Sequence, residues 1–330
     1  MLYQTAAKVN IARRNAEPDM PPDPAEIDRA AAILRAGGLV AFPTETVYGL
    51  GANALAPAAV ARIFAAKGRP STNPLIVHVA DQTQIPPLVD AWPPLAQTLA
   101  ERFWPGPLTL VVRKSTRVPD IVTGSGPTVA LRIPNHPLAL ALLTAAAVPV
   151  AAPSANRSGQ LSPTTAEHVR TSLTGKYDLL LDGGPCPGGL ESTVVEMHPD
   201  GVRLLRPGLI GLAELQEVVG HVLTDPPPFP TDSPAPSPGM LTRHYAPRTA
   251  LECAATPADA DFLAHLYETA GLKVARYACP PDPMEAARSL YADLHALDAT
   301  SPDRIIATLP PDTEAWRTLR DRLVRASAEE

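Results

Sequence analysis

Proline density divides this chain. Between Pro226 and Pro247, eight of 22 residues are proline. Proline has no backbone N–H and a fixed φ angle, so neither a helix nor a central strand can run through such a segment. This composition is typical of an extended, semi-rigid spacer. We therefore predict two folded units joined by a linker over residues 221–248, and a chain of 330 residues is long enough for two cores.

The composition is that of a folded protein. Hydrophobic residues make up 45% of the chain and charged residues 19%, which excludes disorder of the whole chain. No run of 18 apolar residues occurs, so no membrane partner is expected. Residues 1–14 also lack the basic-then-apolar order of a secretory signal. We therefore expect a cytoplasmic protein.

Charge and cysteine content exclude two further classes. Residues 249–330 carry 8 basic and 14 acidic side chains, which makes this part of the chain a poor binder of polyanions. Residues 1–248 are balanced, with 20 of each sign. The cysteines lie far apart without a C-x-x-C pair, so neither a disulfide framework nor a structural zinc site is expected; they are Cys186, Cys253 and Cys279.

Before the linker, residues 23–220 predict an α/β domain. Short apolar runs bounded by Gly or Pro indicate strands, in GGLVAFPT, NPLIVHVA, LTLVV, TVALRIP, VPVAAPS, DLLLDGG, STVVEM and VRLLRPG. Helical patterns cover residues 24–36, 57–67, 137–147 and 211–219. Some strands follow each other too closely for a helical crossover, so the sheet should be mixed. Residues 1–22 form an amino-terminal extension.

After the linker, residues 249–330 predict a small α/β domain. Strands and helices alternate strictly, at 251–255, 258–270, 272–278, 284–297, 304–309 and 313–327. That alternation predicts a Rossmann-like parallel sheet with right-handed crossovers. The domain carries no catalytic signature, so its role stays open.

Polar side chains gather in four turns at the ends of predicted strands. Because such turns let backbone and side chains approach a ligand, we expect the four to converge. They contribute Thr44, Glu45, Thr46 and Tyr48, then Ser154, Asn156, Ser158 and Ser162, then Ser192 and Thr193, and finally Arg206.

Four cationic or titratable residues, in three segments, each allow two interpretations. Lys67 and Arg69 follow a predicted helix and are either solvated cations at its carboxyl end or a clamp for polyphosphate. Arg132 interrupts an apolar strand, so its guanidinium should meet a carboxylate, either in a structural ion pair or on a substrate. His78 is either a core histidine or part of a pocket.

Several familiar nucleotide and nucleophile motifs are absent. The pattern G-x-G-x-x-A at 49–54 follows a strand that ends near Phe42, and no acidic residue stands about 20 positions later, so it is not a dinucleotide fingerprint. The chain has no G-x-x-x-x-G-K-[ST] and no G-x-S-x-G. Neither a P-loop nucleotide site nor a covalent serine hydrolase is therefore expected.

A set of long motifs carries a family resemblance. FPTETVYGLGANA, KGRPSTNPLIVH, FWPGPLT, VALRIP, AAPSANRSG, ESTVV and LLRPG occur in this order within residues 24–219. Together they resemble the YrdC-like family, and SPGMLTRHYAP at 237–247 resembles the signature of its long, two-domain threonylcarbamoyl-AMP synthases. The resemblance implies a YrdC-like mixed, twisted sheet with helices, followed by the small Rossmann-like domain.

The resemblance also implies a reaction. A nucleotidyltransferase of this kind condenses L-threonine, bicarbonate and ATP, accompanied by magnesium, into L-threonylcarbamoyl-AMP and releases pyrophosphate and water. The product would serve threonylcarbamoyladenosine formation next to the anticodon of ANN-decoding tRNAs, through downstream tRNA threonylcarbamoyl-transfer machinery. Balanced charge over residues 1–248 predicts weak or no direct tRNA binding.

The resemblance assigns roles to individual residues. Its K-x-R and S-x-N motifs imply a catalytic set of Lys67, Arg69, Ser154 and Asn156. The implied ATP-binding residues are Lys67, Ser71, Thr128, Ser154, Ser162, Arg206 and Tyr245. The implied threonine-binding residues are Thr44, His78, Arg132, the backbone of Ala152, and Ser192. No protein ligand for a metal is implied, and the linker is expected to cover the pocket as a lid through Tyr245.

Two other functions compete with this one. YrdC-like domains resemble double-stranded RNA binders, so an RNA-binding module is the first alternative. Carbamoyl transfer of the hydrogenase-maturation type is the second, but it requires cysteine-paired zinc motifs that this sequence lacks.

Overall fold

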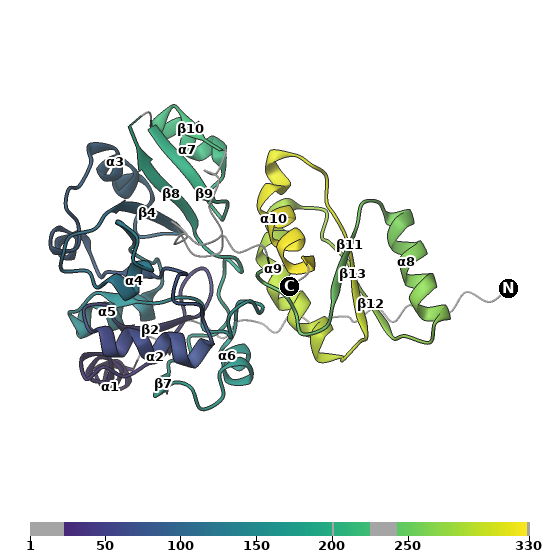
Figure 1. The fold of residues 1–330 in the computed structure, drawn as a ribbon, viewed down its shortest axis with the longest axis horizontal. Helices are drawn as coiled ribbons and strands as arrows, with labels where there is room; N and C mark the ends of the chain where they lie inside the picture. Colours follow the sequence, from purple (N-terminus) through teal and green to yellow (C-terminus); the bar gives the residue numbers. More distant parts are fainter. Residues whose placement is uncertain (1–22, 200, 225–242, 329–330) are drawn as a thin grey trace.

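Two α/β units lie side by side in the molecule (Figure 1). The structure, a computed structural model, describes residues 23–199, 201–224 and 243–328. The elements of residues 24–224 form the larger unit and those of residues 251–327 form the smaller one. The predicted extension 1–22 and linker residues 225–242 lie outside the described residues.

A mixed sheet organises the larger unit. Its strands are β1 (Val40–Phe42), β2 (Gly49–Asn53), β3 (Ile76–His78), β4 (Leu108–Arg113), β5 (Thr128–Arg132), β6 (Val150–Ala151), β7 (Leu179–Leu180), β8 (Thr193–His198), β9 (Gly201–Arg206) and β10 (Val222–Leu223). Within the described residues their order is β10-β9-β8-β4-β5-β3-β6-β2-β1-β7. β3 and β5 pair in parallel, whereas β4 and β5 pair in antiparallel fashion. The predicted mixed α/β fold is therefore confirmed.

Most helices of the larger unit begin with Pro or after a capping side chain. They are α1 (Pro24–Arg35), α2 (Pro57–Lys67), α3 (Pro94–Phe103), α4 (Asp120–Thr123), α5 (Pro137–Ala146), α6 (Ala166–Ser172) and α7 (Leu212–Val219), with short 3₁₀ turns at Gln82–Gln84 and Pro86–Leu88. In α1, the Asp23 carboxylate caps the first turn and Pro24 occupies the first helical position, where its missing N–H costs nothing.

Some elements differ from the prediction. Residues 49–53 form strand β2, paired with β1 and β6, where no strand was predicted. Small side chains are needed there, because a Cβ on Gly51 would lie 2.8 Å from Phe42 and from Val150. Helices α3, α4 and α6 were not predicted, since α4 and α6 are short and α3 follows a cluster of prolines.

The smaller unit matches its predicted alternation. It contains β11 (Leu251–Ala254), α8 (Pro257–Thr269), β12 (Val274–Tyr277), α9 (Pro283–Ala299), β13 (Arg304–Thr308), a 3₁₀ turn (Glu314–Trp316) and α10 (Arg317–Ser327). Both β11 and β12 pair in parallel with the central strand β13. The predicted last helix begins later than expected because its first turn is 3₁₀.

One apolar cluster spans both units. Leu161 and Leu190 of the larger unit pack in it with Leu290 of α9 and Leu323 of α10, and Tyr245 from the end of the linker belongs to the same cluster. In Figure 1, α9 and α10 lie on the side of the small sheet that faces the larger unit, and α8 lies on the other side. The small unit is therefore packed against turns at the strand ends of the large sheet.

The described residues include no helix that is both long and apolar enough to cross a membrane.

Candidate functional site

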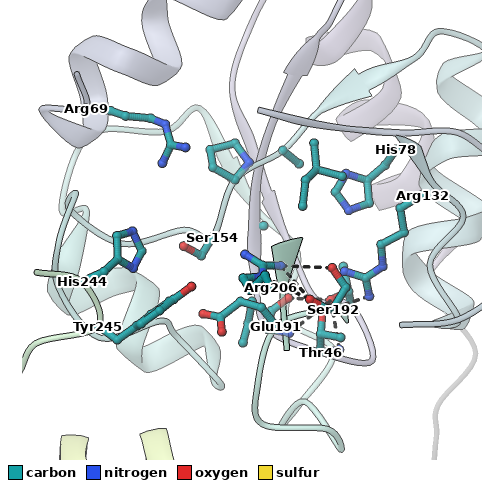
Figure 2. A pocket seen from close by; sticks show the side chains of 16 residues that line it. Thr46, Arg69, His78, Arg132, Ser154, Glu191, Ser192, Arg206, His244 and Tyr245 are labelled. Carbon is teal, nitrogen blue, oxygen red and sulfur yellow. Dashed lines mark hydrogen bonds between the residues drawn. The ribbon is translucent and has the colours of Figure 1, made fainter. Parts of the chain in front are cut away.

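The predicted polar turns meet at one cavity (Figure 2). Its walls come from the ends of β3, β5 and β9, from the turns after β1 and β6, from the residues before β8, and from the end of the linker. The lining residues are Thr44, Thr46, Val47, Gly49, Arg69, Ile76, His78, Arg132, Ala152, Pro153, Ser154, Glu191, Ser192, Arg206, His244 and Tyr245. Segments distant in sequence thus form a single pocket.

The cavity has two sides. In Figure 2, Thr46, His78 and Arg132 lie on one side, and Arg69, His244 and Tyr245 lie on the other. Arg206, Glu191, Ser154 and Ser192 lie between them. Among the described lining residues, three guanidinium groups stand against one carboxylate, a composition that favours anions.

Arg132, at the end of β5, forms a structural ion pair and also lines the cavity, so it fits both interpretations of the sequence. Its Nη2 lies 2.8 Å from Oε1 of Glu45 and donates to Oγ1 of Thr46 at 2.9 Å. Thr46 and Thr44 share a hydrogen bond of 2.7 Å between their hydroxyls. The guanidinium is therefore in a structural ion pair and also in the cavity wall, held at a fixed position for a ligand.

Arg69 lies just beyond the left-handed Gly68 that ends α2. It donates to the carbonyl of Asn73 at 3.0 Å, to Oδ1 of Asn73 at 2.6 Å and to the carbonyl of Pro74 at 2.7 Å. Burial lowers the pKa of Arg69 to about 9, with Arg206 also lowering it and Tyr245 opposing. The group stays cationic at neutral pH, and within the described residues it forms no ion pair, so its charge is available to a bound anion.

Arg206, at the end of β9, lies beside the start of β8. Its Nε and Nη2 donate to the carbonyl of Ser192 at 3.2 and 2.9 Å, and Nη2 also reaches Oγ of Ser192 at 3.1 Å. Oγ of Ser192 is 2.7 Å from Oγ1 of Thr109. This arrangement fixes a cation and a hydroxyl in the middle of the cavity.

Lys67 does not line the cavity. Its Nζ donates to the carbonyl of Ser154 at 2.5 Å and to the carbonyl of Asn156. Burial first, and then the charge of Arg69, hold the pKa of Lys67 well below its usual range. In this conformation Lys67 supports the turn that presents Ser154.

The remaining predicted nucleotide residues also lie outside the cavity wall. Asn156 is buried and donates to the carbonyls of Arg157 and Gln160. Ser162 is buried and donates to Oε1 of Glu191 at 2.5 Å. Ser71 is exposed, and Thr128 is half-buried at the start of β5. The structure thus brings Arg69, Ser154, Arg206 and Tyr245 together, with the threonine set Thr44, His78, Arg132, Ala152 and Ser192.

His78 is a buried, neutral side of the cavity. Burial lowers its pKa to about 3, and the nearby charge of Arg132 acts in the same direction. The ring packs edge-on to Phe42, with 6.4 Å between centroids. His78 therefore adds hydrogen-bonding capacity without charge.

The end of the linker enters the cavity. His244 and Tyr245 are buried, and Tyr245 has φ +64°, a left-handed conformation that costs energy for a non-glycine residue. Neither Nδ1 of His244 nor Oη of Tyr245 has a hydrogen-bond partner among the described residues. Buried polar atoms of this kind indicate a missing ligand or water.

Sequence reasoning assigned no role to three polar residues of the lining. Thr46 was one hydroxyl among several in its turn, and His244 precedes the predicted Tyr245. Glu191 precedes Ser192 in ESTVV, and its carboxylate next to a predicted site residue was the one available sign of a role in the site.

Comparisons with known proteins agree on both units. The family model for Sua5, YciO and YrdC, described as "Telomere recombination", matches residues 32–208. A second model, described as "Threonylcarbamoyl-AMP synthase, C-terminal domain", matches residues 210–328.

Similar proteins cover nearly the whole chain. The threonylcarbamoyl-AMP synthase of Pyrococcus abyssi is 42% identical over 90% of this chain and 93% of its own length. That of Bacillus subtilis is 43% identical over 92% of this chain and 93% of its own. The structure of P. abyssi Sua5 complexed with L-threonine has a TM-score of 0.85 and 41% identity, covering 92% of this chain and 95% of that one.

Proposed function

Because the chain belongs to the Sua5/YrdC family of threonylcarbamoyl-AMP synthases, we propose that the cavity of its larger unit, closed by the end of the linker, is the active site for this reaction. The protein is an enzyme that joins L-threonine, bicarbonate and ATP into L-threonylcarbamoyl-AMP, releasing pyrophosphate and water, for threonylcarbamoyladenosine modification of tRNA. One observation carries the proposed location: Arg69, Arg132 and Arg206, from three distant segments, converge on one cavity.

Threonine would occupy the side of Arg132. The guanidinium suits the substrate carboxylate, and the hydroxyls of Thr44, Thr46 and Ser192 offer partners for its polar groups. The neutral ring of His78 would complete this side. The complex of P. abyssi Sua5 with L-threonine supports an amino-acid site in this fold.

ATP would occupy the side of Arg69 and Tyr245, with its phosphates toward Arg206 and Ser154. Lys67 and Asn156 would act by shaping the Ser154 turn. Ser71, Thr128 and Ser162 remain predicted nucleotide contacts. Magnesium would enter with ATP as part of the substrate, since the described residues contain no cluster of three or more His, Cys, Asp or Glu side chains suited to a metal ion.

The geometry supports a non-covalent adenylyl transfer. The neutral amine of threonine attacks bicarbonate with loss of water, or carbon dioxide with loss of a proton, to give a carbamate. A carbamate oxygen then attacks the α-phosphorus of ATP, and the bond from that phosphorus to the bridging oxygen breaks to release pyrophosphate. Negative charge gathers on the phosphates, and fixed guanidinium groups stabilise it without a protein nucleophile. The reaction class is therefore nucleotidyl transfer.

The linker would act as the lid of this site. With His244 and Tyr245 in place, the cavity holds about 50 Å³, room for a few water molecules but not for ATP. We therefore expect the segment to move outward when nucleotide enters and to return over the product. Shielding from water would protect the reactive carbamate and the mixed anhydride.

Mass spectrometry of the purified protein with ATP, magnesium, bicarbonate and threonine tests this function. The expected product is L-threonylcarbamoyl-AMP, which should disappear when threonine, bicarbonate or ATP is omitted. A salt-dependent gel shift with tRNA, performed in parallel, tests the RNA-binding alternative. Tight tRNA binding without product would overturn the assignment.

A further inference from the structure

The cavity contains a carboxylate where a polyphosphate is expected to bind. Among its described lining residues, Glu191 is the single acidic side chain, and it lies near Arg206 in Figure 2. Glu191 is buried, with 6% of its surface exposed. An unpaired carboxylate at this position would repel phosphate groups, because charges interact strongly in a buried, low-dielectric site.

The small unit supplies the partner of this carboxylate. Nε of Arg322, on α10, lies 3.1 Å from Oε2 of Glu191, and Arg322 is completely buried. The hydroxyl of Tyr291, on α9, donates to both carboxylate oxygens at 3.1 and 2.9 Å. The larger unit contributes the hydroxyl of Ser162 at 2.5 Å.

Arg322 reaches two further parts of the site. Its Nη2 donates to the carbonyl of Pro207 at 2.8 Å, next to Arg206. Its guanidinium carbon lies 4.7 Å from the ring centroid of Tyr245, within cation–π distance of the linker side chain that lines the cavity. Arg322 thus contacts Glu191 in the cavity wall, Pro207 next to Arg206, and Tyr245 in the proposed lid.

We propose that Arg322 is a positioning residue of the nucleotide site, which neutralises and orients Glu191 and holds Tyr245, so that docking of the small unit makes the cavity competent to bind a nucleotide polyphosphate. The identity of that anion as ATP rests on the proposed function. The proposal gives the small unit a specific task, because without it the buried Glu191 carboxylate would lose its ion-pair partner Arg322 and the Tyr291 hydroxyl.

Other groups around Glu191 define what pH should do. The charged and titratable groups that act on it, or on its partner Arg322, are Arg206, Tyr245, Tyr291, Asp321 and Arg322. Burial would raise the pKa of Glu191, but Arg322, Arg206 and the Ser162 hydroxyl together hold it below its usual range. Removing Arg322 should therefore let the pKa rise, and protonation of Glu191 at lower pH should remove the repulsion.

The test is the dissociation constant of the magnesium complex of ATP, measured by titration calorimetry between about pH 6 and 8, where a raised carboxyl pKa would fall. Arg322→Met should weaken binding about tenfold or more at the upper pH, and binding should recover as pH falls. Glu191→Gln added to Arg322→Met should restore much of the affinity and abolish the pH dependence. Arg320→Met is the control, since Arg320 lies on the same helix and pairs with Asp312 outside the cavity.

Tyr291→Phe keeps the proposal testable if Arg322→Met does not fold. This change removes only the hydroxyl that donates to Glu191, so we expect a smaller weakening with the same dependence on pH. The proposal is overturned if affinity is unchanged, or if the loss is equal at every pH and persists in the double variant. Nucleotide binding is measured without turnover, so a wild-type protein that binds ATP but makes no product would refute the proposed function and not this inference.

Discussion

At the scale of residues, the cavity arginines are fixed before any ligand arrives. Arg69 is held by carbonyl and amide oxygens of Asn73 and Pro74, and Arg206 by Ser192. The neutral partners of Arg69 orient its guanidinium without cancelling its charge. Fixed charges stabilise a transition state more than mobile ones do, because they do not have to reorganise during the reaction.

Arg69→Met should lower the rate of threonylcarbamoyl-AMP synthesis on the order of 10²–10³-fold, the usual loss for one preorganised donor. Initial rates of pyrophosphate release, with threonine and bicarbonate saturating, measure the effect. Arg62→Met is the matched control. Arg62 lies on α2, outside the cavity lining, and its Nη2 is 2.8 Å from Oδ2 of Asp178. Equal rates for the two variants would show that Arg69 does not contribute to catalysis.

His78 should make the protein sensitive to acid. Its folded pKa of about 3 lies below the ordinary value of 6.5, so the unfolded chain takes up a proton before the folded one does. The free energy of unfolding should therefore fall as pH drops from about 6.5 toward 3, by up to about 1.4 kcal/mol per pH unit. Urea unfolding of wild type and His78→Gln across this range measures the slope.

The His78→Gln variant should lose this contribution to the slope. His265→Gln, at an exposed position of α8 outside the cavity, is the matched control. A variant at His78 that follows the wild-type curve would show that the ring is not held neutral in the folded state.

At the scale of elements, the loop before β8 is fitted tightly against helix α9. Gly189 has φ +69°, and a Cβ on it would lie 1.9 Å from the backbone oxygen of Arg288. Gly184, in the same loop, has φ +76° but no atom within 4 Å of its Cβ position. Both glycines supply a left-handed turn, but only Gly189 also allows close approach of the two units.

Gly189→Ala should destabilise the protein by about 1–3 kcal/mol more than Gly184→Ala, since it adds a steric clash to the shared backbone strain. Thermal or urea unfolding compares the two variants. Because Gly189 is two residues from Glu191, the same change should also weaken ATP binding. Equal stability of the two variants would mean that α9 does not pack on this loop in solution.

At the scale of the whole molecule, the two units share one site through the linker. His244 and Tyr245 lie in the cavity, while Tyr245 also stacks near Tyr291 of the small unit, with 5.8 Å between ring centroids. Motion of the linker and the arrangement of the two units should therefore be coupled to occupancy of the cavity.

Deletion of residues 237–247 should lower synthesis and shorten the lifetime of enzyme-bound product, because the lid that excludes water is lost. Replacement of the same residues by Gly and Ser, at equal length, distinguishes the effect of losing the side chains from the effect of shortening the linker. Product remaining over time is followed by chromatography. Unchanged synthesis and unchanged product lifetime in both variants would rule out a lid.

Local patterns in the sequence were sufficient for most of the elements and for the composition of the polar turns. Apolar runs bounded by Gly and Pro predicted most strands, and strict alternation predicted the small parallel sheet, because burial of apolar side chains repeats with the period of each element. The motifs also predicted Arg69, Arg132, Ser154 and Arg206 as candidates, and the structure places all four at the cavity.

Only the tertiary structure decided which polar groups face the cavity and what neutralises them. Lys67 was predicted beside the nucleotide, yet its ammonium is turned toward two backbone carbonyls. The role of Glu191 depends on its contact with Arg322, which lies 131 positions later in the chain. The direction of a side chain depends on packing and charge from segments brought together by folding, and no local pattern contains that information.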